Sequence, residues 1–290
     1  GVTFSQYHKE LRTLTMQHYH SDLADAIASI RAMYFQEESY FVENYISQDD
    51  DPQSLEYRTR ISEWCYQLVD FCHFNRETVA IAINYLDRFL MSNRSALQDL
   101  DSLQLAAMTC LYIAVKIHEP EIMSTEMIAR LSAKKYSEKD VTKMELRILK
   151  TIQWRMNPPT PLSFVRYFMG LVPGLKKHQY EEIFDIAKFQ TELAVNSYDI
   201  VRLRPSTIAF AALVNALQCV QLPILSQDCF LSNMNNAMAA IDVQSDEFID
   251  TQDMLYFSVQ SANSRANALK PKSTPKRTKS METRGIPLIS

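Results

Sequence analysis

Two stretches of this chain are apolar on almost every face of a helix. Residues 103–117 read LQLAAMTCLYIAVKI, and residues 205–220 contain the run IAFAALVNAL. A helix that is hydrophobic all round is buried at the centre of a larger structure. Only four glycines occur in 290 residues, which disfavours hairpins, sheets of many short strands and glycine-lined phosphate sites. We therefore expect an all-α protein with two bundles, each built around one central helix.

Amphipathic helices are expected around each central run, because apolar residues recur there at helical spacing. Asp101 with Gln104 and Ser137 with Asp140 match the pattern of residues that cap helix starts. Three prolines between residues 158 and 161 break the chain between the halves. The pattern indicates an internal duplication of about five helices per half. The expected helices cover residues 55–70, 77–91, 101–117, 124–131, 137–152, 181–198 and 205–220.

Four segments follow from this pattern. Residues 1–52 are expected to form an N-terminal extension with one helix over Asp22–Ile46, residues 53–157 the first bundle, and residues 158–264 the second bundle. Residues 265–290 are expected to be a disordered tail, because they are rich in Ser, Thr, Pro and Lys and can bury little apolar surface.

The tail is basic and the rest of the chain is acidic. Residues 265–290 hold seven basic residues and one acidic residue, a charge of +6, which leaves −10 on residues 1–264. A basic run of this kind fits nuclear import or nucleic-acid contact, and it equally fits a tail that only keeps the chain soluble. Thr274 is followed by Pro275, Lys276 and Arg277, a pattern that proline-directed kinases phosphorylate.

Two charged residues lie inside strongly apolar segments: Asp87 in INYLDRFL and Lys116 near the end of the first central run. Because Asp and Lys are almost never fully buried unless they are paired, we expect ion pairs inside the helical domain. No apolar run is expected to reach the ~18 residues of a membrane span, so no membrane contact is predicted. The five cysteines form no CxxC, and four of them lie in strongly apolar stretches, so we expect a reduced intracellular protein with buried thiols.

Several short motifs resemble the cyclin box in order and spacing. The match is clearest over residues 55–155, and the chain is similar to cell-cycle cyclins of the A and D kinds. The motifs are Arg58-x-x-Ile61-x-Glu63-Trp64, Asn84-Tyr85-Leu86-Asp87-Arg88-Phe89-Leu90, Leu103-Gln104-Leu105, Ala114-Val115-Lys116 and Met144-Glu145. The resemblance implies two tandem five-helix cyclin folds. It also implies a regulatory subunit that binds and allosterically activates a cyclin-dependent serine/threonine kinase and so controls cell-cycle progression, without a catalytic residue, cofactor or metal of its own.

The resemblance also assigns partners to the charged residues. Arg58 and Asp87 are expected to form a structural ion pair between the first two helices, and Leu105 to lie in the core. Lys116 and Glu145 are expected at the kinase-binding surface. The alternative is that all four charges only fix the geometry of the fold. The other residues implied at the kinase-binding surface are Ile117, His118, Leu149, Trp154 and Met156, of which Trp154 fits a core position equally well.

Cyclins have a second site, a shallow groove that docks short basic and leucine-containing peptides of kinase substrates or inhibitors. Two positions depart from the family. Arg60 replaces a usual apolar residue, which puts docking in doubt, and His118 stands where an acid is usual, which would alter the choice of kinase. The residues at the groove positions are Tyr57, Ile61, Trp64, Gln67, Leu103 and Gln104.

Other function classes stay in view. A cyclin of a transcriptional or nutrient-sensing kinase would share these features, and a nucleic-acid-binding adaptor of the TFIIB kind would share the duplicated fold. The charge of −10 on residues 1–264 argues against nucleic-acid binding by the bundles. An enzyme would need convergent nucleophile, base or metal ligands, and the motifs HExxH, GxSxG and GxxxxGK[ST] do not occur. The resemblance implies a nuclear location, with the cytoplasm as a second compartment.

Overall fold

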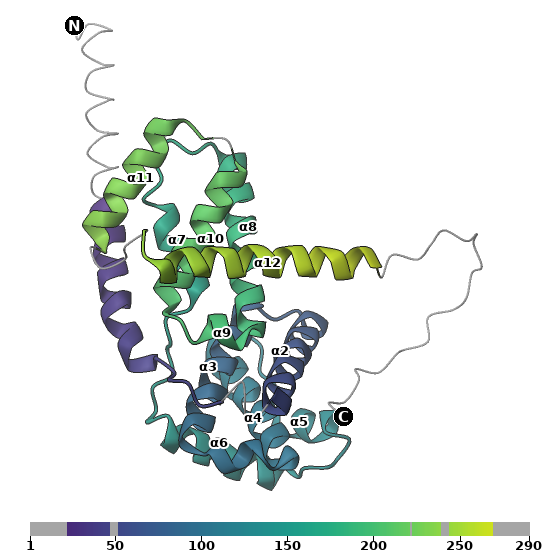
Figure 1. Ribbon diagram of the computed structural model, residues 1–290. Helices are drawn as coiled ribbons and strands as arrows, with labels where there is room; N and C mark the ends of the chain where they lie inside the picture. Colours follow the sequence, from purple (N-terminus) through teal and green to yellow (C-terminus); the bar gives the residue numbers. More distant parts are fainter. Residues whose placement is uncertain (1–21, 47–51, 221, 239–243, 269–290) are drawn as a thin grey trace, which may run out of the picture.

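The computed structural model describes residues 22–46, 52–220, 222–238 and 244–268, and every regular element within these ranges is helical (Figure 1). The expected all-α fold with two bundles is therefore confirmed. The first bundle contains α2 (Pro52–Cys72), α3 (Glu77–Ser92), η2 (Arg94–Leu97), α4 (Leu100–His118), α5 (Thr125–Leu131) and α6 (Glu138–Thr151). The second contains α7 (Pro161–Met169), α8 (Lys177–Asn196), the short α9 (Tyr198–Val201), α10 (Pro205–Cys219), α11 (Ile224–Ala237) and α12 (Asp246–Ala268).

The two all-apolar runs form the central helices α4 and α10. Twelve residues of α4 and ten of α10 are buried, so each helix is covered on nearly all sides by its own bundle. By length and composition alone α4 is long enough to cross a membrane, which corrects the expectation that no apolar run reaches that length. Its most apolar window is 67% buried inside the protein, so the packed core accounts for its composition.

Local sequence sets where the helices begin. The predicted cap of α6 is confirmed: the Ser137 hydroxyl accepts from the Asp140 N–H, and the Asp140 carboxylate accepts from the Ser137 N–H. The predicted start of α4 at Asp101 is wrong. The carboxylate of Asp99 accepts from the Asp101 N–H at 3.2 Å, and the helix begins at Leu100. A side-chain cap of this kind is worth about 1 kcal/mol.

The helix before the first bundle ends earlier than expected. Among the described residues it runs from 22 to 37 and does not continue to Ile46, because the 3-10 helix η1 (Glu38–Tyr40) and extended backbone follow it. This helix runs beside the second bundle (Figure 1). Ile30 on it is fully buried in the core of the second bundle. Further along the same segment, Val42, Tyr45 and Ile46 lie in the core of the first bundle, so the N-terminal segment packs against both halves of the chain.

Glu37 fixes the end of this helix to α10. Its carboxylate accepts from the backbone N–H of Ser206 at 3.0 Å and from the Ser206 hydroxyl at 2.7 Å. The residue preceding α10, Arg204, makes no side-chain cap, so Glu37 satisfies a free N–H at that helix start. Glu37 is almost fully buried, and burial raises the pKa of its carboxyl, although the Ser206 hydrogen bonds and Arg204 oppose that rise.

Three helices end in left-handed backbone at residues other than glycine. At each end, a backbone N–H donates to the carbonyl five residues earlier, an arrangement in which glycine usually occupies the left-handed position. Left-handed backbone costs other residues about 1–2 kcal/mol. The residues are His73 after α2 (φ 58°), Ala133 and Lys134 after α5 (φ 50° and 63°), and Gln153 and Trp154 after α6 (φ 56° and 57°).

At the other end of the chain, α12 lies across the second bundle and extends beyond it (Figure 1). It continues to Ala268, so residues 265–268, which were expected to begin the tail, are helical. Residues 269–290, including the proposed phosphorylation position Thr274, lie outside the described residues. The five cysteines are free, as expected. Not all of them are buried as expected. Cys65 and Cys110 are buried, Cys72 is partly buried, and Cys219 and Cys229 are exposed.

Candidate functional site

Lys116 and Glu145 form an ion pair between the end of α4 and the middle of α6. The Lys116 Nζ lies 3.0 Å from the Glu145 Oε1 and 5.5 Å from the centre of the Tyr112 ring. The hydrogen bond to Glu145 raises the pKa of the Lys116 amine. The pairing agrees with the resemblance, but the expectation that Lys116 is buried is wrong. Half of its side chain is exposed, because the last turn of α4 emerges from the core.

The other positions implied at the kinase-binding surface are mostly apolar. Ile117 is 46% exposed and Trp154 is 62% exposed, so Trp154 is not a core residue. Leu149 and Met156 are partly buried against the first core and lie on α6 and in the segment after it. All the residues implied at the kinase-binding surface therefore come from the end of α4, from α6 and from the turn that follows α6. We call Lys116, Ile117, His118, Glu145, Leu149, Trp154 and Met156 the α4–α6 surface.

His118 and Tyr85 hold the segment that contains Met156. The Tyr85 hydroxyl donates to the carbonyl oxygen of Met156, and the Nε2 of His118 lies 3.2 Å from both that oxygen and the Tyr85 hydroxyl. His118 is thus a structural contact of this surface as well as an unusual residue type. The sequence alone assigned no role to Tyr85, which lies two residues before Asp87 in INYLDRFL.

Arg58 and Asp87 form the expected buried pair. Arg58 Nε and Nη2 donate to the two carboxylate oxygens of Asp87 at 2.9 and 2.8 Å, and both side chains are at most 2% exposed. Asp87 also accepts from the Tyr45 hydroxyl at 2.6 Å, and Arg58 Nη1 donates to the Val195 carbonyl at 3.0 Å. The pair therefore joins α2 and α3 to the N-terminal segment and to α8. Leu105, expected in the core, is partly buried against it.

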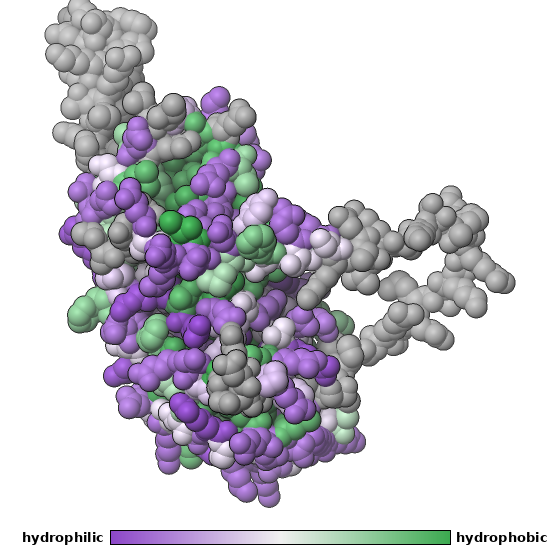
Figure 2. All heavy atoms as spheres, viewed as in Figure 1, coloured by the Kyte–Doolittle hydropathy of each residue, from purple (hydrophilic) through white to green (hydrophobic). Residues whose placement is uncertain are grey.

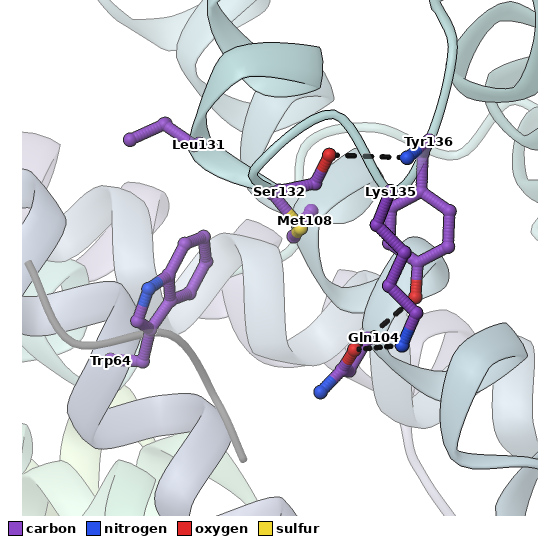
Figure 3. A pocket seen from close by; sticks show the side chains of 7 residues that line it. All are labelled: Trp64, Gln104, Met108, Leu131, Ser132, Lys135 and Tyr136. Atoms are coloured by element: carbon purple, nitrogen blue, oxygen red, sulfur yellow. Dashed lines mark hydrogen bonds between the residues drawn. The ribbon is translucent and has the colours of Figure 1, made fainter.

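The residues at the docking-groove positions are only partly brought together. A cavity of about 120 Å³ lies between α2, α4 and the α5–α6 connection, where Lys135 Nζ and the Tyr136 hydroxyl both contact the Gln104 Oε1 (Figure 3). Its lining contains Trp64 and Gln104 but not the other four groove positions. Ile61 and Leu103 are 1% exposed and lie in the core. The full lining is Trp64, Gln104, Met108, Leu131, Ser132, Lys135 and Tyr136.

The remaining groove residues lie outside this lining. Tyr57 is partly buried and its hydroxyl accepts from the Gln53 amide at 2.6 Å, whereas Gln67 is exposed. Arg60, the residue that departs from the family, is exposed, and its Nη2 lies 2.8 Å from the Glu56 Oε1 one turn earlier. The Glu56 carboxylate therefore reduces the local positive charge that Arg60 introduces.

On the face drawn in Figure 2 polar residues predominate, and hydrophobic ones appear in separate patches. Among the described residues no group of three or more His, Cys, Asp and Glu side chains is arranged to hold a metal ion.

Comparison with known proteins covers almost the whole described chain. The family described as cyclin, N-terminal domain, matches residues 29–157, and the family described as cyclin, C-terminal domain, matches residues 159–284. The chain is 30% identical over 162 residues to Cyclin-D4-2 of Arabidopsis thaliana, covering 54% of each protein. It is 31% identical over 176 residues to Cyclin-B2-2 of the same plant, covering 61% of this chain and 39% of that protein. These matches thus span about half or less of the relatives' own length.

Solved structures share the fold at lower identity. A viral cyclin from herpesvirus saimiri superimposes with a TM-score of 0.56 at 16% identity, covering 72% of this chain and 86% of that one. A chain of the CAK complex from Chaetomium thermophilum bound to ATP-gamma-S gives a TM-score of 0.52 at 15% identity, covering 84% and 74%. With both halves matched by the two cyclin domain families and folded as two helical bundles, this chain belongs to the cyclin family.

Proposed function

We propose that this chain is the non-catalytic regulatory subunit of a cyclin-dependent serine/threonine kinase, which it binds as a heterodimer and activates allosterically to control cell-cycle progression. The α4–α6 surface carries the proposal. It combines the Lys116–Glu145 pair with exposed Ile117 and Trp154. Tryptophan is among the residue types enriched at protein-binding hot spots, and the Trp154 side chain is mostly exposed. The similarity to D-type and B-type cyclins supports a kinase as the partner.

The mechanism needs no reacting group on this chain. A protein kinase is active only when its strand lysine pairs with a glutamate on its mobile helix. A partner that binds the active position of that helix better than the inactive one shifts the kinase toward activity by that difference in affinity. Trp154 and Ile117 would supply apolar contact, and the Lys116–Glu145 pair would order the backbone that receives the helix.

The groove is proposed as a second contact for kinase substrates or inhibitors. The cavity beside Trp64 and Gln104 offers an apolar wall from Met108 and Leu131 together with the Lys135 amine (Figure 3). Because Lys135 is paired with the carboxylate of Asp101, its charge is partly compensated. Docking of peptides there is compatible with Arg60, whose charge the Glu56 carboxylate offsets. We also propose a nuclear location, on the strength of the basic residues 265–290.

The test is to mix the chain with a panel of monomeric cyclin-dependent kinases and to measure co-purification and phosphorylation of a histone-type substrate. Lys116→Ala is the diagnostic variant. Lys177→Ala, an exposed lysine on α8 that also faces a carboxylate one turn away, is the matched control. A chain that ends at Ala268 retains the whole of α12 and tests the tail.

Activation by the wild type, the control and the truncated chain, but not by Lys116→Ala, is the expected result. Folded protein that binds no kinase in the panel would refute the proposal. That result would favour the alternative of a nucleic-acid-binding adaptor of the TFIIB kind. For such an adaptor, nucleic-acid binding is expected to be lost on removal of residues 269–290 and to fall steeply with salt concentration.

A further inference from the structure

The turn after α6 holds the backbone of Trp154 in a left-handed conformation, which is unfavourable for a residue other than glycine. Gln153 and Trp154 are consecutive left-handed residues, with φ of 56° and 57°, and neither is glycine. The Trp154 side chain is 62% exposed, so burial in the core does not stabilise this geometry. Backbone strain of this kind persists only where surrounding contacts over-determine the conformation.

Arg88 of α3 supplies those contacts. Its Nη2 donates to the Ile152 carbonyl at 2.8 Å, and its Nη1 donates to the Arg155 carbonyl at 2.9 Å. These two carbonyls lie on either side of the left-handed pair. Because the guanidinium group is planar and its N–H groups point in fixed directions, one side chain sets the distance and angle between the two ends of the turn.

The N-terminal segment closes over this contact. The Arg88 guanidinium lies 4.9 Å from the centre of the Tyr40 ring, and Arg155 Nη1 donates to the Ser39 carbonyl at 3.2 Å. Arg88 is consequently only 7% exposed. The turn that carries Trp154 is therefore held by contacts from both α3 and η1.

The burial of Arg88 is not compensated by a carboxylate. Arg58 on α2 is buried against Asp87, but among the described residues Arg88 forms no such ion pair. The charged or titratable groups that act on its pKa are Tyr40, Tyr85 and the cationic Arg155. Burial accordingly lowers the pKa of the Arg88 guanidinium. A buried cation bound only to carbonyls and an aromatic ring is costly for stability alone, which points to a role in holding those carbonyls.

We propose that Arg88 is a positioning residue of the α4–α6 surface: it fixes the strained turn that presents Trp154 to the kinase, and it acts through that turn without touching the kinase. This inference rests on the proposed function. The turn after α5 provides an internal comparison, because Ala133 and Lys134 are also left-handed there, while the Ser132 hydroxyl bonds to the Ala129 carbonyl and the Tyr136 N–H.

The first experiment measures the mobility of the Trp154 side chain in the absence of a kinase. Trp64 and Trp154 are the two tryptophans of the chain, so Trp64→Phe leaves Trp154 as the single indole. In that background, time-resolved fluorescence anisotropy is measured for Arg88, Arg88→Ala and Arg88→Lys. We expect faster and wider motion of Trp154 in both variants, because the lysine amine keeps the charge but cannot reproduce the two-pronged contact.

The second experiment links the turn to binding. With native Trp64, both Arg88 variants are expected to weaken kinase affinity by roughly tenfold or more, while the far-ultraviolet circular dichroism stays that of the wild type. Adding Gln153→Gly to Arg88→Lys is expected to raise the kinase affinity roughly twofold to fivefold above that of Arg88→Lys alone. The reason is that glycine adopts the left-handed conformation without strain. Lys134→Gly is the matched control, expected to relieve strain in the other turn without restoring affinity.

Unchanged Trp154 anisotropy in both Arg88 variants would overturn the inference, and so would equal rescue by Lys134→Gly, because affinity would then follow global stability. If Arg88→Ala fails to fold, Arg88→Lys and its rescue decide the question. Failure of the proposed function gives a different result: the wild type would bind no kinase although its Trp154 is ordered. In that case Arg88 fixes the turn for another purpose, and its role in kinase binding is refuted.

Discussion

Replacing Asp87 with asparagine tests how strongly the buried ion pair supports the fold. The substitution keeps the size of the side chain but removes the charge that accepts two hydrogen bonds from Arg58 and one from Tyr45. The guanidinium of Arg58 would then remain, 2% exposed, without a counter-charge. Removing one partner of a buried pair costs about 3–5 kcal/mol. With a urea dependence of about 3 kcal/mol per molar, the midpoint of unfolding is expected to fall by about 1–1.7 M.

The assay is urea unfolding followed by far-ultraviolet circular dichroism, with the double variant Arg58→Met and Asp87→Leu as its control. Replacing both charges by apolar side chains removes the cost of the uncompensated cation. The double variant is therefore expected to be more stable than Asp87→Asn. A loss below about 1 kcal/mol in Asp87→Asn, or a double variant at least as unstable as the single one, would refute the reasoning.

Three further perturbations follow from the same structure. Lys116→Ala is expected to weaken binding of a monomeric kinase roughly tenfold or more without changing helix content, and calorimetric titration showing unchanged affinity would contradict this. The folded-state pKa of Glu37 lies above its ordinary value of 4.5, so ionisation costs stability as pH rises through that raised pKa. When the free energy of unfolding is measured across a pH series, the stability of Glu37→Gln relative to the wild type should therefore increase as pH rises above about 4.5. A relative stability that decreases over this range would exclude burial as the dominant cause of the pKa shift. His73→Gly removes a left-handed non-glycine residue and is expected to add about 0.4–1 kcal/mol, measurable as a higher melting temperature; a lower one would show that the imidazole stabilises the turn.

Features set by local pattern could be predicted from the sequence. The apolar character of α4 and α10 depends only on composition along one helix, and it predicted both bundle centres. The ion pairs of Arg58 with Asp87 and of Lys116 with Glu145 came from the resemblance, and their atoms do meet in the structure. The exposure of Lys116 could not be predicted in this way, because it depends on how far the last turn of α4 extends past the neighbouring helices.

Features set by contacts between distant segments were missed. Nothing in the helix of residues 22–37 predicts that Ile30 enters the core of the second bundle, or that Glu37 caps α10 across 169 positions of sequence. Ile61 and Leu103 were expected in an open groove because the family positions match, yet both lie in the core. A pattern of residue types does not determine which side of a helix the neighbouring elements leave open.

The shortage of glycine links the fold to the proposed binding surface. A helix end that needs left-handed backbone usually takes glycine, and this chain places Gln153 and Trp154 there instead. The strain must then be held by contacts from outside the turn, and Arg88 provides them from α3. In Arg88→Lys, where the contacts that hold the turn are weakened, a glycine at this position helps because it relieves the strain. With Arg88 present, the same glycine would only leave the turn free to adopt other conformations. The strained turn with its buried clamp therefore gives Trp154 one fixed orientation, which lowers the entropy lost when a partner binds.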